Sequence, residues 1–399
     1  MDNKQCDNTY LTKENKEIIS KNDENKKLFQ NNFVLELIFK IDLNNLLDHY
    51  HFLNNSSYVI AIHELSNKNF GILLSKRLTI ISPISFKTIK TISPFYEEMH
   101  SSNFMGRNDF IDFIELNNNY IIIWTSNVIL FYDNEYNLVQ KIDEYEYGDR
   151  CERVDDEYGK EIYYEINSIR ELKNGKLISC NSYGLKFYEK NLNLNKYELI
   201  STVKMEIDVD YVIEIKPNVL ILLQKHYDES IDDMEGVDKY LVSIYNIEDK
   251  SLKEVFRTRK FSMMGDFHKV NYIISNKYLY VRFGDTMEIF DLENNMENIT
   301  IENIEYKYET NFGIYEKIMK KENRIKEVLS TYNDYYFFGK DNEWNLNLYS
   351  FYNNNLNICH HFEIKDIVGV IKSKNNDIII YSSKCELYKF QPIFSQNNK

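Results

Sequence analysis

The sequence predicts an all-β protein, a seven-bladed β-propeller closed by a strand from the N-terminal part of the chain. Three observations predict it. From Phe33 onward, apolar runs of about five to seven residues recur between Asn, Asp and Lys turns, and long helical periodicity is almost absent. The chain has 32 Tyr and 24 Phe but only 12 Gly and 4 Pro, which favours strands. The apolar runs also group into units that repeat at a spacing of about 50 residues, typical of propeller blades.

The clearest unit is Ile166–Lys190, which fits a strand, an Asn-Gly turn, a strand, a Ser-Tyr-Gly turn and a strand. Asn174-Gly175 is a strong hairpin signal because both positions can adopt a positive φ. In most units a fourth run follows the third strand, for example Leu138–Ile142. The other six units are Tyr58–Ser82, Phe110–Asp133, Tyr211–Asn246, Val270–Asp291, Val328–Ser350 and Ile367–Lys389.

The two ends of the chain complement each other in this arrangement. The last unit nearly stops after three strands, whereas Phe33–Ile41 has the pattern of an outer strand without a blade of its own. Placing this strand on the final blade closes the ring and removes an open sheet edge. We therefore predict a disordered Asn/Lys-rich tail over residues 1–30 and a propeller over residues 31–395. The alternative is a β-sandwich followed by a second β domain.

One segment favours a helix. Asn311–Leu329 places Ile314, Ile318, Ile325 and Leu329 loosely on one helical face, and this face is expected to pack onto the propeller.

The repeats resemble the WD40 family over about residues 33 to 390. The resemblance rests on the rhythm of Leu172–Glu189, with FYD at Phe131–Asp133 and IFD at Ile289–Asp291 where that family ends its third strand. The family's Gly-His and Trp-Asp pairs are absent, and the turn after Ser179 lacks the aspartate of its internal hydrogen-bond tetrad. The resemblance implies the architecture of a diverged WD40-like propeller.

Charge and cysteine usage limit the partners and the compartment. Lys+Arg 48 against Asp+Glu 62 gives a net charge of −14, which disfavours binding to nucleic acid or to an anionic membrane. No apolar run approaches the roughly 18 residues of a membrane span. The five cysteines form no CxxC pair, and the polar N-terminus lacks a signal-peptide pattern. These features predict a cytoplasmic protein with reduced thiols.

The sequence contains none of the common catalytic or nucleotide-binding motifs, such as GxGxxG, HExxH or GxSxG. His49 and His51 could face the same side of a strand, but no third metal ligand is evident. We therefore predict a non-enzyme without cofactor or metal. The alternative is a glycosidase-like propeller hydrolase with carboxylates around the central channel, which requires a deep axial pocket lined by several carboxylates.

Acidic residues concentrate in two predicted loops on one face of the ring. Asp143–Tyr163 has nine acidic and three basic residues (net −6), and Lys225–Asp238 has six acidic residues and one lysine (net −5). They predict a scaffold that binds a basic protein segment, acting as a monomer within a complex. The alternatives are that these loops only keep the protein soluble, or that they bind calcium. The candidate binding residues are Asp143, Glu144, Glu146, Asp149, Asp155, Asp156, Glu157, Asp228, Glu229, Asp232, Asp233 and Glu235.

Overall fold

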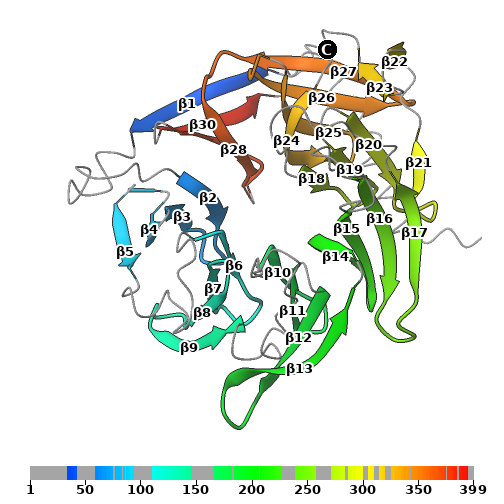
Figure 1. The fold of residues 1–399 in the computed structure, drawn as a ribbon. Helices are drawn as coiled ribbons and strands as arrows, with labels where there is room; N and C mark the ends of the chain where they lie inside the picture. Colours follow the sequence, from blue (N-terminus) through cyan, green and yellow to red (C-terminus); the bar gives the residue numbers. More distant parts are fainter. Residues whose placement is uncertain are drawn as a thin grey trace, which may run out of the picture.

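The computed structural model describes residues 34–42, 59–74, 77–82, 84–85, 87–93, 110–144, 166–181, 184–205, 207–226, 239–257, 271–283, 286–299, 304–309, 314–319, 325–341, 343–373, 375–383 and 386–393. The regular elements over these ranges are the strands β1–β30, which surround a central axis in chain order (Figure 1). No helix in this part of the chain is long and apolar enough to cross a membrane. The tail predicted over residues 1–30 lies outside the described residues.

The first four blades are antiparallel four-stranded sheets in simple chain order. Blade 1 consists of β2 (Val59–Glu64), β3 (Phe70–Leu74), β4 (Arg77–Ile81) and β5 (Thr88–Ile92). Blade 2 consists of β6 (Asp112–Glu115), β7 (Ile121–Trp124), β8 (Val128–Tyr132) and β9 (Leu138–Asp143). Blade 3 consists of β10 (Ser168–Glu171), β11 (Leu177–Asn181), β12 (Gly184–Asn191) and β13 (Lys196–Lys204). Blade 4 consists of β14 (Asp208–Lys216), β15 (Val219–His226), β16 (Lys239–Asn246) and β17 (Leu252–Arg257).

The remaining three blades complete the ring. Blade 5 consists of β18 (Asn271–Ile274), β19 (Tyr278–Phe283), β20 (Thr286–Asp291) and β21 (Glu297–Ile299). Blade 6 consists of β24 (Ile325–Asn333), β25 (Tyr336–Asp341), β26 (Leu346–Tyr352) and β27 (Asn355–Phe362). Blade 7 consists of β28 (Ile367–Lys372), β29 (Ile378–Ser382), β30 (Glu386–Ile393) and β1 (Val34–Asp42). The predicted architecture of seven blades is therefore confirmed, with the first strand of each blade nearest the axis (Figure 1).

The N-terminal strand β1 is the outer strand of blade 7. It pairs antiparallel with β30 from Val34↔Ile393 to Asp42↔Glu386, with one register shift between Leu37 and Phe39. The two ends of the described chain thus share one sheet. The contribution of this pairing to ring closure stays a prediction, which the truncations in the Discussion test.

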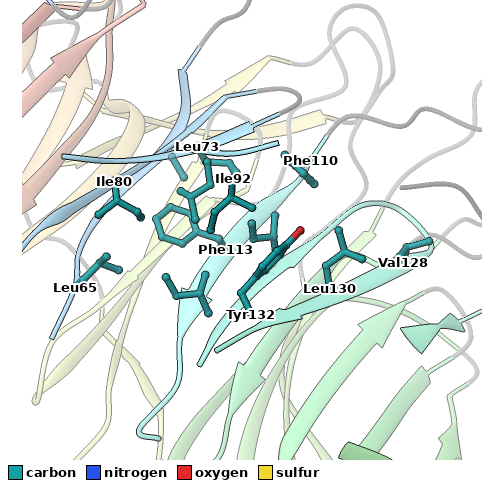
Figure 2. Packing of buried hydrophobic residues seen from close by; sticks show 13 residues of the cluster. Leu65, Leu73, Ile80, Ile92, Phe110, Phe113, Val128, Leu130 and Tyr132 are labelled. Carbon is teal, nitrogen blue, oxygen red and sulfur yellow. The ribbon is translucent and has the colours of Figure 1, made fainter. Parts of the chain in front are cut away.

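The apolar core is divided into seven clusters, one between each pair of adjacent blades. Figure 2 shows the cluster between blades 1 and 2, where Phe113 of β6 packs against Leu73 and Ile80. Gly71 is required beside this ring, since a Cβ at that position would lie 2.7 Å from a Phe113 ring carbon. A further cluster joins blade 7 to blade 1 through Ile379 and other residues, so apolar contacts run around the entire ring.

The helix predicted over Asn311–Leu329 is wrong. Its described residues form β23 (Ile314–Met319), which pairs with β22 (Ile304–Glu309) in a hairpin outside the seven blades, and the first part of β24. Register shifts interrupt the pairing of β24 with β25 at three points. Each bulge adds a residue and breaks the strand period of two. The buried positions of β24 are therefore Ile325, Val328 and Tyr332, at the 3- and 4-residue spacing that resembles a helix.

The predicted hairpin at Asn174-Gly175 is present, but its turn type differs from the expected one. Only Gly175 has a positive φ (81°), and its N–H donates to the Leu172 carbonyl at 2.8 Å, while the Leu172 N–H donates to the Lys176 carbonyl at 2.8 Å. This is the three-residue loop in which a left-handed residue follows a type I turn.

We expect Gly175→Val to lower the free energy of unfolding by about 1 kcal/mol or more, because a β-branched residue is forced into the left-handed region. The effect should come from the backbone alone, since no atom lies within 4 Å of a Cβ built at Gly175. Gly175→Asn is the control, because Asn tolerates this region and should cost much less. Urea denaturation of the wild type and the two variants measures the difference. Equal stability of all three proteins would contradict a left-handed conformation at Gly175.

Candidate functional site

One face of the ring carries the turns between the first and second strands of the blades, and we call it the turn face. Among the described residues, these turns span residues 65–69, 116–120, 172–176, 217–218, 275–277, 334–335 and 373–377. The opposite face, where first strands begin and fourth strands end, is called the loop face.

Neighbouring blades are joined on the turn face by a recurring contact, which we call a carboxylate clamp. A turn amide of one blade donates to a carboxylate of the next blade, which lies at or near the end of the first strand in blades 2 to 4 and in the first turn in blade 6. The clamps join Ser66 to Glu115 (2.5 Å), Asn117 to Glu171 (2.8 Å), Lys173 to Glu214 (2.5 Å) and Asn276 to Asp334 (2.9 Å). Hydrogen bonds to a carboxylate are stronger than neutral ones, so each clamp fixes the angle between two blades.

Where the structure describes the turn residues, the clamp is replaced at two interfaces. In the turn of blade 4, Pro217 has no N–H to donate, and Ile274 stands at the end of β18 where other blades carry a carboxylate. In blade 7 the corresponding residue is Lys372, whose Nζ donates to the Tyr332 carbonyl of blade 6 at 2.8 Å. The positions that hold carboxylates elsewhere in the ring thus hold an apolar residue and a cation here.

A pocket of about 1,100 Å³ opens on the turn face in this part of the ring. Its wall comes from blades 3 to 7, and it spans both interfaces in which the clamp is replaced. The charged groups that line it are Lys173, Glu214, Lys216, Glu293, Asp334 and Lys372.

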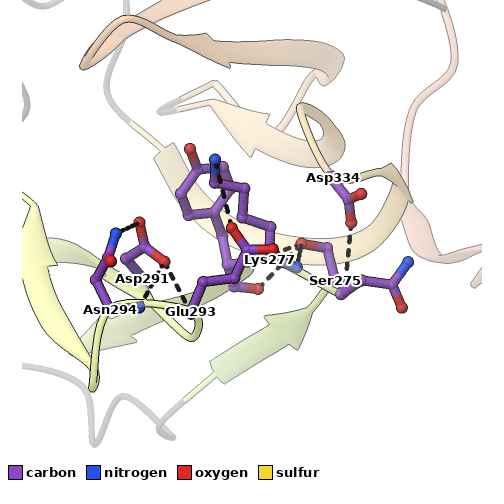
Figure 3. A network of polar contacts seen from close by, with 8 residues as sticks. Ser275, Lys277, Asp291, Glu293, Asn294 and Asp334 are labelled. Carbon is purple, nitrogen blue, oxygen red and sulfur yellow. Dashed lines mark hydrogen bonds and ion pairs between the residues drawn. The ribbon is translucent and has the colours of Figure 1, made fainter. Parts of the chain in front are cut away.

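Blade 5 contributes residues 274–276, 292 and 293 to the lining of this pocket. Polar contacts hold its turns in place (Figure 3). Asp291 accepts the backbone N–H groups of Glu293 (2.9 Å) and Asn294 (3.2 Å), which fixes the outer turn. The Ser275 hydroxyl accepts the N–H of Lys277 at 3.2 Å and fixes the inner turn. The shape of the wall is therefore set by side chains that cap the backbone of their own turns.

The lysines that line the pocket can donate more hydrogen bonds than they make. Lys173 Nζ donates to the Ile215 carbonyl at 3.0 Å, and Lys372 Nζ has one carbonyl acceptor. Each ammonium group can donate three hydrogen bonds. Burial lowers the pKa of Lys372, and the nearby Asp334 carboxylate opposes this shift. Lys216 is exposed and makes no hydrogen bond or ion pair with another described residue.

A second polar cluster lies deeper, on the first strands around the axis. Arg170 of blade 3 donates to the Tyr272 hydroxyl of blade 5 at 3.2 Å, past the first strand of blade 4. The Tyr211 ring of blade 4 lies edge-on to Tyr272 with centroids 4.9 Å apart. The interaction with Tyr272 raises the pKa of the Arg170 guanidinium in spite of its burial, so it stays charged. These contacts connect blades 3, 4 and 5 close to the axis.

Of the twelve acidic residues proposed from the sequence, the structure describes two, and both are buried. Asp143 is 7% exposed and Glu144 is 5% exposed, so neither side chain belongs to a solvent-facing surface. This corrects the sequence-based assignment of these two residues. The other ten lie outside the described residues: Glu146, Asp149, Asp155, Asp156, Glu157, Asp228, Glu229, Asp232, Asp233 and Glu235.

Glu144 instead holds blades 2 and 3 together on the loop face. Its carboxylate pairs with Lys186 Nζ and accepts hydrogen bonds from the hydroxyls of Tyr188 and Ser179, the latter at 2.8 Å. The sequence analysis missed this role because it treated Glu144 as part of an acidic run. A signal was present, since a lysine that points inward from a buried strand requires an anionic partner.

The described residues give no support to the hydrolase alternative. Among the carboxylates of the first strands, Asp112 is 3.2 Å from His63 Nε2, and Glu327 accepts a hydrogen bond from Lys340 Nζ at 2.5 Å. Within the described ranges, no group of three His, Cys, Asp or Glu residues could hold a metal ion. His49 and His51 lie outside these ranges.

Comparison with known proteins identifies the fold. No family model matches the chain, and a search of the curated proteins finds no match. Among solved structures, the WD40 domain of Pan2 from Neurospora crassa matches with a TM-score of 0.57 at 10% identity, over 92% of this chain and 96% of that one. The WD40 repeats of RRP9 match with a TM-score of 0.56 at 9% identity, over 91% and 100%. A chain of the mitotic checkpoint complex matches with a TM-score of 0.55 at 10% identity, over 92% and 94%.

These matches cover 91–92% of this chain and agree with the class that its sheets define, a β-propeller with seven blades. The resemblance read from the repeats is confirmed at the level of the fold, which is that of the WD40 propellers.

Proposed function

We propose that the protein is a non-catalytic scaffold that binds protein partners, and that the acidic segments on its loop face recruit a basic segment. The observation that carries the proposal is where the described strands end. β9 ends at Asp143 and β15 ends at His226, both on the loop face, so the acidic runs that follow start from one face of the ring. Charge of one sign gathered on a rigid frame speeds and orients association with a partner of opposite charge.

The similar structures support the coarser part of this proposal. One of them belongs to the mitotic checkpoint complex, an assembly, and two are WD40 repeat domains. A fold that presents many loops on a rigid ring suits such a role, although a fold by itself assigns no function. We propose that the protein acts in the cytoplasm, as one copy within a complex, and that it binds neither nucleic acid nor membranes.

Neutralising part of the acidic region tests the proposal. We expect the variant Asp228→Asn, Glu229→Gln, Asp232→Asn, Asp233→Asn to keep its thermal stability and to bind a labelled oligolysine peptide several-fold more weakly, because the steering charge is reduced. Binding of the wild type should fall steeply as salt rises. Fluorescence anisotropy across a salt series gives both results.

The control variant removes four carboxylates from exposed positions on third and fourth strands: Glu189→Gln, Glu198→Gln, Glu254→Gln and Glu297→Gln. It has the same net charge as the test variant. If both variants weaken binding equally, the attraction reflects overall charge and the proposed loop-face site is wrong.

A further inference from the structure

The pocket on the turn face differs in charge pattern from the rest of the ring. Glu115, Glu171 and Glu214 mark the ends of first strands in blades 2 to 4. The pocket spans the four interfaces from blade 3 to blade 7. At two of them, between blades 4 and 5 and between blades 6 and 7, Ile274 and Lys372 stand in place of a clamp carboxylate. The pocket therefore keeps the clamp carboxylates Glu214 and Asp334 and lacks one at its other two interfaces.

The carboxylates that remain in the pocket are already engaged. Glu214 and Asp334 each accept a turn amide, and Glu293 lies 3.8 Å from Lys277, a lysine outside the lining. By contrast, the ammonium groups of Lys173 and Lys372 donate only to neutral carbonyl groups, and that of Lys216 has no partner among the described residues. The free hydrogen-bonding capacity of the lysines is thus suited to an anion.

The size and the apolar lining of the pocket select the kind of anion. At about 1,100 Å³, it exceeds the roughly 300–1,000 Å³ typical of small-molecule pockets. Half-buried Ile215, Leu292 and Tyr335 add apolar contact surface between the charged groups. A nucleic acid would bring one charge per nucleotide towards a chain of net charge −14, whereas a short peptide brings only a few.

From these observations we infer that the turn-face pocket binds an acidic, partly apolar segment of a partner protein. Carboxylates of the segment pair with Lys173, Lys216 and Lys372, and an aliphatic or aromatic residue lies against the apolar lining. The site is on the opposite face from the ends of β9 and β15, where the acidic runs start, and it has the opposite charge preference. The scaffold therefore distinguishes two partners by charge.

A labelled peptide of alternating Glu and Leu residues is the probe, with a Gln and Leu peptide of equal length as its control. We expect the wild-type protein to bind the Glu peptide and not the Gln peptide in fluorescence anisotropy. Lys173→Gln and Lys216→Gln should each weaken binding roughly two- to fivefold, the range for exposed charge pairs, and the double variant roughly by the product. Both lysines are exposed, so melting temperatures should not change.

The matched control is Lys250→Gln with Lys253→Gln, which removes two exposed lysines of blade 4 outside the pocket. Equal weakening by this control, or no binding of the Glu peptide, would overturn the inference. So would tighter, lysine-dependent binding of inorganic polyphosphate or single-stranded DNA than of the peptide. The loop-face variant should bind the Glu peptide no more weakly than the wild type, so failure of either proposal is distinguishable from failure of the other.

Discussion

Deletion of residues 1–42 is expected to abolish soluble expression or cooperative thermal unfolding, whereas deletion of residues 1–30 should leave the melting temperature almost unchanged. The longer deletion removes β1, which pairs with β30 along its whole length. The outer edge of β30 then loses its strand partner, and unpaired edges promote aggregation. The shorter deletion removes a sequence with few core-forming residues and retains β1.

Differential scanning fluorimetry and the soluble fraction after expression measure this difference. A synthetic peptide of residues 31–42 added to the longer deletion provides a further control, since it should restore part of the melting transition if β1 acts through pairing alone. Identical melting of the two truncated proteins would mean that the ring is closed without β1, through the apolar cluster between blades 7 and 1.

Replacement of Glu144 by Ala is expected to lower the free energy of unfolding by about 3–5 kcal/mol, because it leaves the Lys186 ammonium buried without a counter-charge. Lys186 is 6% exposed, and the Ser179 and Tyr188 hydroxyls lose the same acceptor. Urea denaturation followed by tryptophan fluorescence measures the loss.

The control is Glu189→Ala, which removes a carboxylate 3.4 Å from Lys176 at an exposed position and should cost less than about 1 kcal/mol. The double variant Glu144→Gln, Lys186→Met should recover most of the stability, since it removes the buried charge and keeps an acceptor for the hydroxyls. If Glu144→Ala lowers the free energy of unfolding no more than Glu189→Ala does, then Lys186 reaches water and the contacts of Glu144 contribute little to stability.

The blade pattern could be predicted because each strand is short, apolar and bounded by turn residues. Ile121–Trp124 and Ile378–Ser382, for example, are buried along their whole length and lie within two of the units predicted from apolar runs. The error at β24 has the same origin, since bulges moved its buried residues out of the alternating pattern. The turn at Gly175 was located correctly, but the turn type depends on one additional hydrogen bond that the dipeptide does not specify.

The turn-face pocket was not predicted, because its parts come together only through the ring. Each clamp joins residues far apart in the chain, such as Ser66 and Glu115, separated by 49 positions. A trace of the clamps is visible in the sequence, where Glu-Leu recurs at Glu64-Leu65, Glu115-Leu116 and Glu171-Leu172. At the end of the first strand, the Glu-Leu pair is absent from blades 4 to 7, as at Ile274-Ser275 and Lys372-Ser373, and this absence marks the pocket only once the blades are aligned.

The partnership of β1 with β30 has a consequence for synthesis on the ribosome. Val34 pairs with Ile393, which is translated 359 residues later. At roughly 5–20 residues per second, β1 waits on the order of tens of seconds for its partner after leaving the exit tunnel. During this time the strand VLELIFKID is an apolar segment with no sheet to join. Of the described strands, β1 is thus made first and paired last, so this apolar segment stays open to nonspecific contacts while the rest of the ring is synthesised.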